Sequence, residues 1–159
     1  MDEQQIGAAL HQASVEVLEK MFFVDARSLP GEIRPPDGWG LVVEVAFDGA
    51  LPGRLRLHLS DGAAAGIAVN FLGEDPSGVS PRQAMEVAAE LANMICGSVL
   101  SSIESSAAFR LSTPRVLGAG EAGPPPPATC CALDTGHGSL MVSMATDSSP
   151  CPAIAKSAY

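Results

Sequence analysis

Residues 80–109, SPRQAMEVAAELANMICGSVLSSIESSAAF, decide the fold because they join a complete helix start to a long helical repeat. Ser80 is a favourable N-cap residue, Pro81 suits the first helical position, and Gln83 completes a capping box. The pattern predicts an amphipathic helix that runs to about residue 107. Its apolar side is formed by Ala84, Ala88, Leu91, Ala92, Ile95, Val99 and Ile103.

A polar stripe runs along the outward side of the same helix. Its members follow one another at helical spacings of three or four residues: Glu86, Glu90, Asn93, Gly97, Ser101 and Glu104. Asn is a poor helix former, and Gly costs about 1 kcal/mol relative to Ala. Because two unfavourable residues share one outward stripe, we infer that this surface is kept for something other than helix stability.

The composition limits the class of protein. A chain of 159 residues that is 47% apolar can fill one proper core, and its 4% aromatic content predicts aliphatic and small-residue packing. The formal net charge of −9 and the scattered basic residues argue against nucleic-acid binding, which needs clustered Lys and Arg. We expect one domain over residues 1–147 and a flexible tail over residues 148–159.

The sequence carries no targeting, membrane or metal pattern. The start, MDEQQIGAAL, lacks the basic and apolar regions of a secretory signal, and no stretch approaches the about 18 apolar residues of a membrane span. The isolated histidines have no second metal ligand at helical spacing, and no two cysteines form a C-x-x-C pair. We therefore expect a cytoplasmic chain with free thiols. The cysteines are Cys96, Cys130, Cys131 and Cys151, and the histidines are His11, His58 and His137.

Periodicity elsewhere predicts a sheet and further helices. A helix is expected at 6–24, and a short helix, capped at Ser60, is expected to stop near Gly73. Strands are expected at 40–48, 53–60, 113–119, 127–133 and 138–145, and the four consecutive prolines within 120–127 predict an exposed loop. The fold class is therefore α/β in a layered α+β form, with two long helices packed on a largely antiparallel sheet.

Alternation in the first two strands fixes which side faces the core. They should pair as a hairpin, with Leu55, Leu57 and Leu59 turned inward. Arg54, Arg56 and His58 should then point outward.

A family resemblance follows from these motifs. Residues 84–97, AMEVAAELANMICG, resemble the E-x-x-N helix of the CheC/CheX/FliY phosphatases of bacterial chemotaxis. The segments VEVAFDGALPGRLRLHLS and AAAGIAVNFLGED are similar to the hairpin and short helix that precede the motif, and LSTPRVLGAG resembles the segment after it. The likeness covers about residues 6–146 and implies a CheC-like fold.

The chain departs from the family pattern at three places. Glu86 stands where Asp or Ser is usual, four residues before Glu90. Pro114 fits the family's later proline at a slightly short spacing. The first helix has Glu16 and Glu19 but no asparagine, which implies one site per chain, as in CheX-like members.

The resemblance implies a phosphatase that hydrolyses the aspartyl phosphate of a CheY-like response-regulator receiver domain, in chemotaxis or a related two-component pathway. Glu90 and Asn93 are the implied catalytic residues: the Asn93 carboxamide orients a water, and Glu90 pairs with a lysine of the receiver. Glu86, Gly97 and Ser101 are the candidates for partner binding. Mg²⁺ would belong to the receiver, so no cofactor of its own is expected.

Two further expectations complete the interpretation. The rival function is a non-catalytic CheX-like binding or adaptor module, for receiver domains or for a flagellar-switch-type assembly. A homodimer is expected because the family pairs sheet edges and because LMVSMA, residues 140–145, lacks a protective lysine or proline.

Overall fold

The computed structural model describes residues 3–30, 33, 35, 38–49, 51–104, 108–118 and 128–146. Its helices are α1 (Glu3–Met21), α2 (Asp61–Leu72) and α3 (Pro81–Ile103), with a 3₁₀ turn, η1 (Pro76–Gly78), before α3. Its strands are β1 (Arg27–Leu29), β2 (Leu41–Gly49), β3 (Gly53–Leu59), β4 (Phe109–Leu111), β5 (Arg115–Val116), β6 (Thr129–Asp134) and β7 (Ser139–Thr146).

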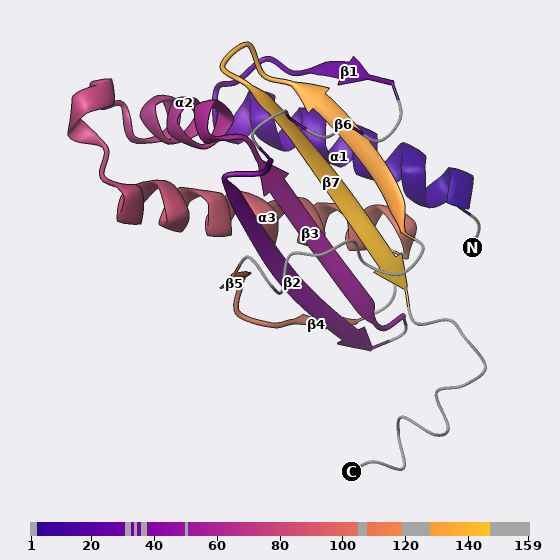
Figure 1. Ribbon diagram of the computed structural model, residues 1–159. Coiled ribbons are helices and arrows are strands. Elements are labelled where there is room, and N and C mark those ends of the chain that lie inside the picture. The colour runs from indigo at the N-terminus through magenta and orange to yellow at the C-terminus, as the bar shows by residue number, and fades with distance from the viewer. Residues whose placement is uncertain are drawn as a thin grey trace.

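The helices form one layer and the strands form another (Figure 1). In the described part of the chain, the seven strands make one sheet in the order β1-β6-β7-β3-β2-β4, with β5 also paired to β2. Every strand pairing is antiparallel. The predicted layered α+β class is therefore confirmed, with α2 as a third helix beside the two long ones.

The β2–β3 hairpin forms in the register that alternation predicts. Val43 pairs with Leu57 and Val45 pairs with Leu55, and all four side chains are fully buried under the helices. Because side chains alternate across a strand, this register places the apolar set of both strands on one face of the sheet.

Local capping chemistry sets the helix starts, as the sequence predicts. The Ser80 hydroxyl accepts from the Gln83 N–H at 3.1 Å, and the Gln83 side chain accepts from the Ser80 N–H at 2.8 Å. The two bonds satisfy orphan donors at the start of α3. At its other end α3 stops at Ile103, earlier than predicted, with Glu104 as C-cap, and residues 105–107 lie outside the described residues.

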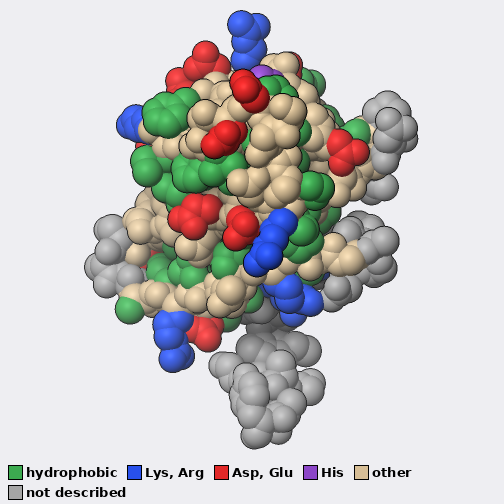
Figure 2. All heavy atoms as spheres, turned by 90° about the vertical axis from the view of Figure 1, so that its left-hand side faces the viewer, with side chains coloured by type: hydrophobic (Ala, Val, Ile, Leu, Met, Phe, Trp, Pro, Cys, Tyr) green, Lys and Arg blue, Asp and Glu red, His purple; other side chains and the backbone are tan. Residues whose placement is uncertain are grey.

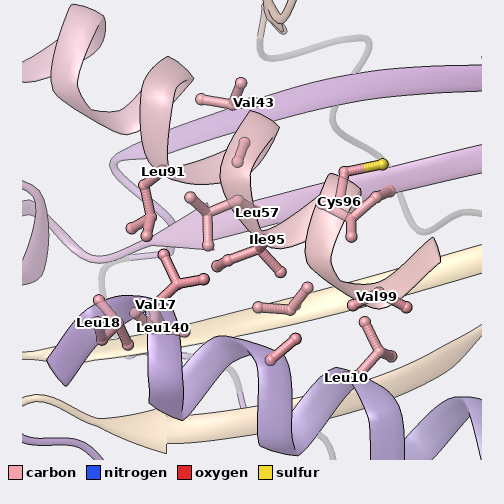
Figure 3. Close-up of a cluster of buried hydrophobic side chains, with 14 of the residues drawn as sticks. Leu10, Val17, Leu18, Val43, Leu57, Leu91, Ile95, Cys96, Val99 and Leu140 are labelled. Carbon is pink, nitrogen blue, oxygen red and sulfur yellow. The ribbon is translucent and has the colours of Figure 1, made fainter. Parts of the chain in front are cut away.

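The core fills the space between the helix layer and the sheet. Figure 3 shows Val17 of α1 pointing toward Leu91 of α3, and Leu10 of α1 lying opposite Val99 of α3. Leu57 of β3 lies next to Ile95 of α3 in the same cluster. These side chains are almost wholly buried, and burial of such aliphatic groups contributes roughly 1.5–3 kcal/mol each. The packing fixes α3 against the sheet and thereby fixes the direction of its outer face.

The second face of the sheet is partly covered. Arg56 and His58 do point away from the helices, but His58 is buried and Arg56 is half-buried. The His58 Nδ1–H donates to the Met141 carbonyl at 3.3 Å, and the imidazole lies against the Trp39 ring, 5.7 Å between centroids. The predicted outward direction of this row is confirmed, and strand alternation leaves open what covers it, because it predicts only the side of a residue.

The predictions for the last strands need correction. The segment 113–119 contains only the two-residue strand β5 and irregular backbone up to residue 118, and the short edge strands β1 and β4 were not predicted. β7 lies in the middle of the sheet, between β6 and β3, so LMVSMA is not an unpaired edge. The predicted loop at 120–127 and the tail at 148–159 lie outside the described residues, and the domain boundary at 147 stays a prediction.

Candidate functional site

The polar stripe lies on the solvent side of α3. Glu86, Glu90 and Ser101 are exposed, whereas Asn93 and Gly97 are half-buried. Side chains three or four positions apart on a helix have Cβ atoms about 5–6 Å apart, so the carboxylate of Glu90 and the carboxamide of Asn93 can reach one bound group. The structure therefore brings the predicted site residues together on one surface.

The two central side chains of the stripe are free to bind. Among the described residues, Glu90 and Asn93 have no hydrogen-bond or ion-pair partner. A carboxamide that is neither paired nor deeply buried keeps both its donor and its acceptor capacity. The stripe thus presents one anionic group and one neutral donor and acceptor, ready for an external partner.

Gly97 is not required by the packing of the described residues. A Cβ built on Gly97 would meet none of their atoms within 4 Å. A Cβ at Gly66, a glycine of α2, would instead collide with the His137 ring. Since Ala is the better helix former by about 1 kcal/mol, no internal contact accounts for glycine at position 97.

The inner side of α3 makes the site rigid. Leu91, Ala92 and Ile95 flank the motif from below and are completely buried. Cys96 lies among them, and burial raises the pKa of its thiol to about 12 (Figure 3). A thiol that stays protonated near neutral pH is a poor nucleophile, so this cysteine serves packing rather than chemistry.

A polar groove of about 510 Å³ separates the start of α1 from the end of α3. Its walls are Gln5, Ala8, Ala9 and Gln12 on α1, and Ser102, Ile103 and Glu104 at the end of α3. On α1, the Gln12 side chain donates to the Glu16 carboxylate at 3.3 Å. The first helix offers no second carboxylate and asparagine pair, in line with the single predicted site.

The remaining predicted features are placed as follows. Pro114 is half-buried directly before β5, and Glu104 is the exposed C-cap of α3. In the part of the chain that the structure describes, no three His, Cys, Asp or Glu side chains are grouped to hold a metal ion. Across the same residues, every helix is too short or too polar to span a membrane.

The family model described as Chemotaxis phosphatase CheX matches residues 41–130, which include β2, β3, α2 and the whole of α3. The chain belongs to the CheX family. The match covers more than half of the sequence and includes Glu90 and Asn93. A search of curated proteins found no match.

Solved structures with the same fold agree with this assignment. The chemotaxis protein CheX from Vibrio vulnificus is 19% identical with a TM-score of 0.71, covering 92% of this chain and 99% of that one. CheX from Desulfovibrio desulfuricans is 19% identical, with a TM-score of 0.67 and coverages of 89% and 99%. A chain of the CheX-CheY-BeF3-Mg²⁺ complex from Borrelia burgdorferi is 16% identical, with a TM-score of 0.68 and coverages of 87% and 96%.

The sequence interpretation missed the apolar surface at the amino-terminal end of the site. Met85 is exposed directly beside Glu86, and Phe23, Phe71 and Leu72 are exposed at the nearby ends of α1 and α2. A helical or strand period assigns such residues to the core by default, because the pattern alone does not show which apolar residues a helix end leaves uncovered.

Proposed function

We propose that this CheX-family chain hydrolyses the aspartyl phosphate of a CheY-like receiver domain, with Glu90 and Asn93 as its catalytic residues. One observation carries the proposal: the two side chains of the family motif lie on neighbouring turns of a rigid, exposed helix face, and both lack a partner among the described residues. Removing a phosphoryl group is mainly a matter of positioning and electrostatics, which a free carboxamide and a free carboxylate supply.

The Asn93 carboxamide positions the attacking water. Its oxygen accepts a hydrogen bond from the water, which attacks the phosphorus in line with the aspartyl oxygen. The bond between phosphorus and that oxygen breaks, the aspartate leaves as a carboxylate, and both protons of the water remain with the phosphate. Asn93 takes up no proton, so it works by orientation and not as a base.

Glu90 fixes the register of the docked receiver. Its carboxylate can form a charge-assisted hydrogen bond to a lysine beside the phosphorylated aspartate. Mg²⁺ held by the receiver would shield the phosphoryl charge. Gly97, Glu86 and Ser101 extend this contact along α3, with Gly97 allowing close approach of the partner backbone.

The rival is an adaptor of the same fold that binds receivers without hydrolysing their phosphate. A binding module has no need of a free carboxamide beside the carboxylate, and the Asn93 carboxamide is free among the described residues. The observation therefore favours the phosphatase.

The deciding experiment measures phosphate release from a panel of phosphorylated receiver domains. The parent should accelerate release from its own receiver, and Asn93→Ala should lower that rate by roughly tenfold to a thousandfold. Gln4→Ala removes an exposed carboxamide at the start of α1, far from the motif, and should leave the rate unchanged. An unchanged rate in Asn93→Ala would falsify the catalytic role.

A further inference from the structure

Four exposed apolar side chains gather where the carboxyl ends of α1 and α2 meet. They are Met21, Phe23, Phe71 and Leu72, here called the Phe23 patch, and Phe23 is the most exposed at 70%. Figure 2 faces the end of the molecule that carries α2 and the start of α3, and it shows hydrophobic side chains next to Asp and Glu side chains. An apolar group of this kind beside polar residues is typical of a protein-binding surface.

Phe23 adopts a backbone conformation that favours glycine. Its φ is 59°, and the neighbouring helix α2 ends with the same left-handed geometry at Gly73, where φ is 66°. For a residue with a Cβ this conformation carries an energetic cost, because the Cβ lies too close to the following carbonyl oxygen. Because the ring is also left in water, burial within this chain does not offset the cost. An external contact would explain why a phenylalanine stands at this turn.

The patch is held in place before any partner arrives. The Asn70 side chain donates to the Phe23 carbonyl at 3.1 Å, which ties the turn to α2. The buried Phe22 ring stacks on Phe71 with 4.5 Å between centroids. A surface that is already ordered loses little conformational entropy on binding, so its apolar area contributes more to affinity.

The patch lies level with the amino-terminal half of the polar stripe. α1 and α3 run antiparallel (Figure 1), and Figure 3 shows Val17 and Leu91 pointing toward one another in the core. At a rise of about 1.5 Å per residue, Met21 at the end of α1 lies about 6 Å beyond Val17, and Glu86 lies about 7.5 Å before Leu91, toward the same end. With helix axes about 8–10 Å apart, the carboxyl end of α1 and the amino-terminal part of the polar stripe, at Glu86, lie at the same end of the helix layer.

We propose that the Phe23 patch is the apolar part of the surface that docks the receiver domain, with Phe23 as its anchor. The inference rests on the proposed function. A typical interface covers about 800 Å² on each partner, a disc of about 16 Å radius, which is wide enough to span the end of α1 and the amino-terminal part of the polar stripe. The polar stripe alone offers no aromatic or large apolar anchor of the kind that dominates binding energy.

The receiver is the occupant because the patch and the motif share one footprint. A receiver docked on Glu90 and Asn93 extends toward the patch, because the patch and the motif lie toward the end of the helix layer where α1 stops and α3 starts. We therefore infer a receiver that carries an exposed apolar side chain at the rim of its phosphorylation site.

The test variant is Phe23→Gly, which removes the ring and suits the left-handed turn. The dissociation constant for receivers activated with beryllium fluoride and Mg²⁺ should rise at least about tenfold, since aromatic anchors dominate interfaces. The melting temperature should stay level or rise, because the strain is relieved. With phosphorylated receiver, KM should rise while kcat is retained, as expected when uniform binding is lost. Phe23→Asn, a second residue that tolerates this turn, should behave alike.

Controls separate this inference from the proposed function. Arg110→Gln changes an exposed side chain on β4 and should leave affinity unchanged. If Phe23→Gly binds the receiver like the parent while Asn93→Ala still loses turnover, the patch inference is wrong and the proposed function stands. If Phe23→Gly converts a dimer to a monomer, the patch belongs to a second copy and the inference is overturned. A parent that binds no receiver of the panel overturns both.

Discussion

Gly97 lies one helical turn beyond Asn93 on the same face of α3, and among the described residues no atom comes within 4 Å of where its Cβ would stand. The two residues therefore form a step in the surface: a side chain that can hold a water, followed by bare backbone. Such a step suits a partner whose own backbone approaches α3 closely. Replacement of Gly97 should therefore leave folding intact, because an added side-chain carbon contacts no described neighbour.

Gly97→Ala should raise stability and weaken receiver binding. Ala is a better helix former than Gly by about 1 kcal/mol, and the new methyl group has open space in the free protein. In the complex, the same methyl group would meet the receiver. Urea unfolding and titration against a beryllium fluoride-activated receiver measure the two effects.

Gly66→Ala is the matched control, because Gly66 is also a helical glycine but its position has no room for a Cβ. Its methyl group would collide with the His137 ring, so this variant should lose stability where Gly97→Ala gains it. Equal receiver affinity in the parent and in Gly97→Ala would show that no close approach takes place at this step.

Glu90→Ala should weaken the complex as well as slow the reaction. If its carboxylate pairs with a receiver lysine at a desolvated contact, removal costs about 2 kcal/mol or more of binding free energy. Asn93→Ala should bind nearly as the parent does, because the water it positions contributes to the transition state. Titration of both variants against an activated receiver separates the roles, and parent-like affinity in Glu90→Ala rules out the docking role.

How well the sequence predicts each element of the fold depends on how close together in the chain the residues that determine it lie. The start of α3 follows from Ser80 and Gln83 because a capping box is formed by residues three apart. The stripe follows from the helical period. β1 and β4 were missed because strands of three residues show no clear alternation, and they form only where β6 and β2 offer a partner.

Strand order and surface character are non-local and were not predicted. Nothing in LMVSMA reveals that β7 is inserted between β6 and β3, since that order depends on residues 53–59 and 129–134 folding beside it. The exposure of Phe23 was missed for a related reason. An aromatic residue at the end of an apolar repeat is read as core, and its positive φ is visible only in three dimensions.

Stability should fall in alkali, with Cys96 as the main cause. Burial raises the pKa of Cys96 from 9.0 to about 12, and burial together with the neighbouring Cys130 raises that of Cys131 to about 11. Between pH 9 and the raised pKa of each thiol, the unfolded chain loses the thiol proton while the native chain keeps it. The free energy of unfolding therefore falls as the pH rises from about 9. Each thiol lowers the free energy of unfolding by up to about 1.4 kcal/mol for each pH unit in this range.

Cys96→Ala provides the check on this alkaline slope. Urea midpoints under reducing conditions at pH 8 and pH 10.5 should differ less in Cys96→Ala than in the parent. The variant starts from a lower stability at pH 8, because it leaves a small cavity under α3. An identical pH dependence in both proteins would mean that Cys96 does not cause the alkaline loss.

We expect the parent to be a homodimer in solution, as the family resemblance of the sequence implies. With β7 in the interior, the sheet ends instead at β1 on one side and at β4 and β5, which both pair with β2, on the other. An edge pairing would therefore have to involve one of these short strands. Light scattering at micromolar concentration measures the mass. A value near the 16.3 kDa of one chain contradicts the dimer.

Val142→Pro should unfold the chain rather than separate two subunits. Val142 is fully buried and pairs with Leu57 of β3 on one side and Cys131 of β6 on the other. Proline has no N–H to donate to the neighbouring strand, and within sheets it is found essentially only on edge strands. In the middle of a sheet we expect it to lower the free energy of unfolding by several kcal/mol, which is about the whole stability of a small domain. Val142→Ala keeps the N–H and should stay folded, less stable by about 1–3 kcal/mol. Circular dichroism and light scattering on both variants decide the matter: a folded, monomeric Val142→Pro next to a dimeric parent would place β7 at a subunit interface and contradict its central position in the sheet.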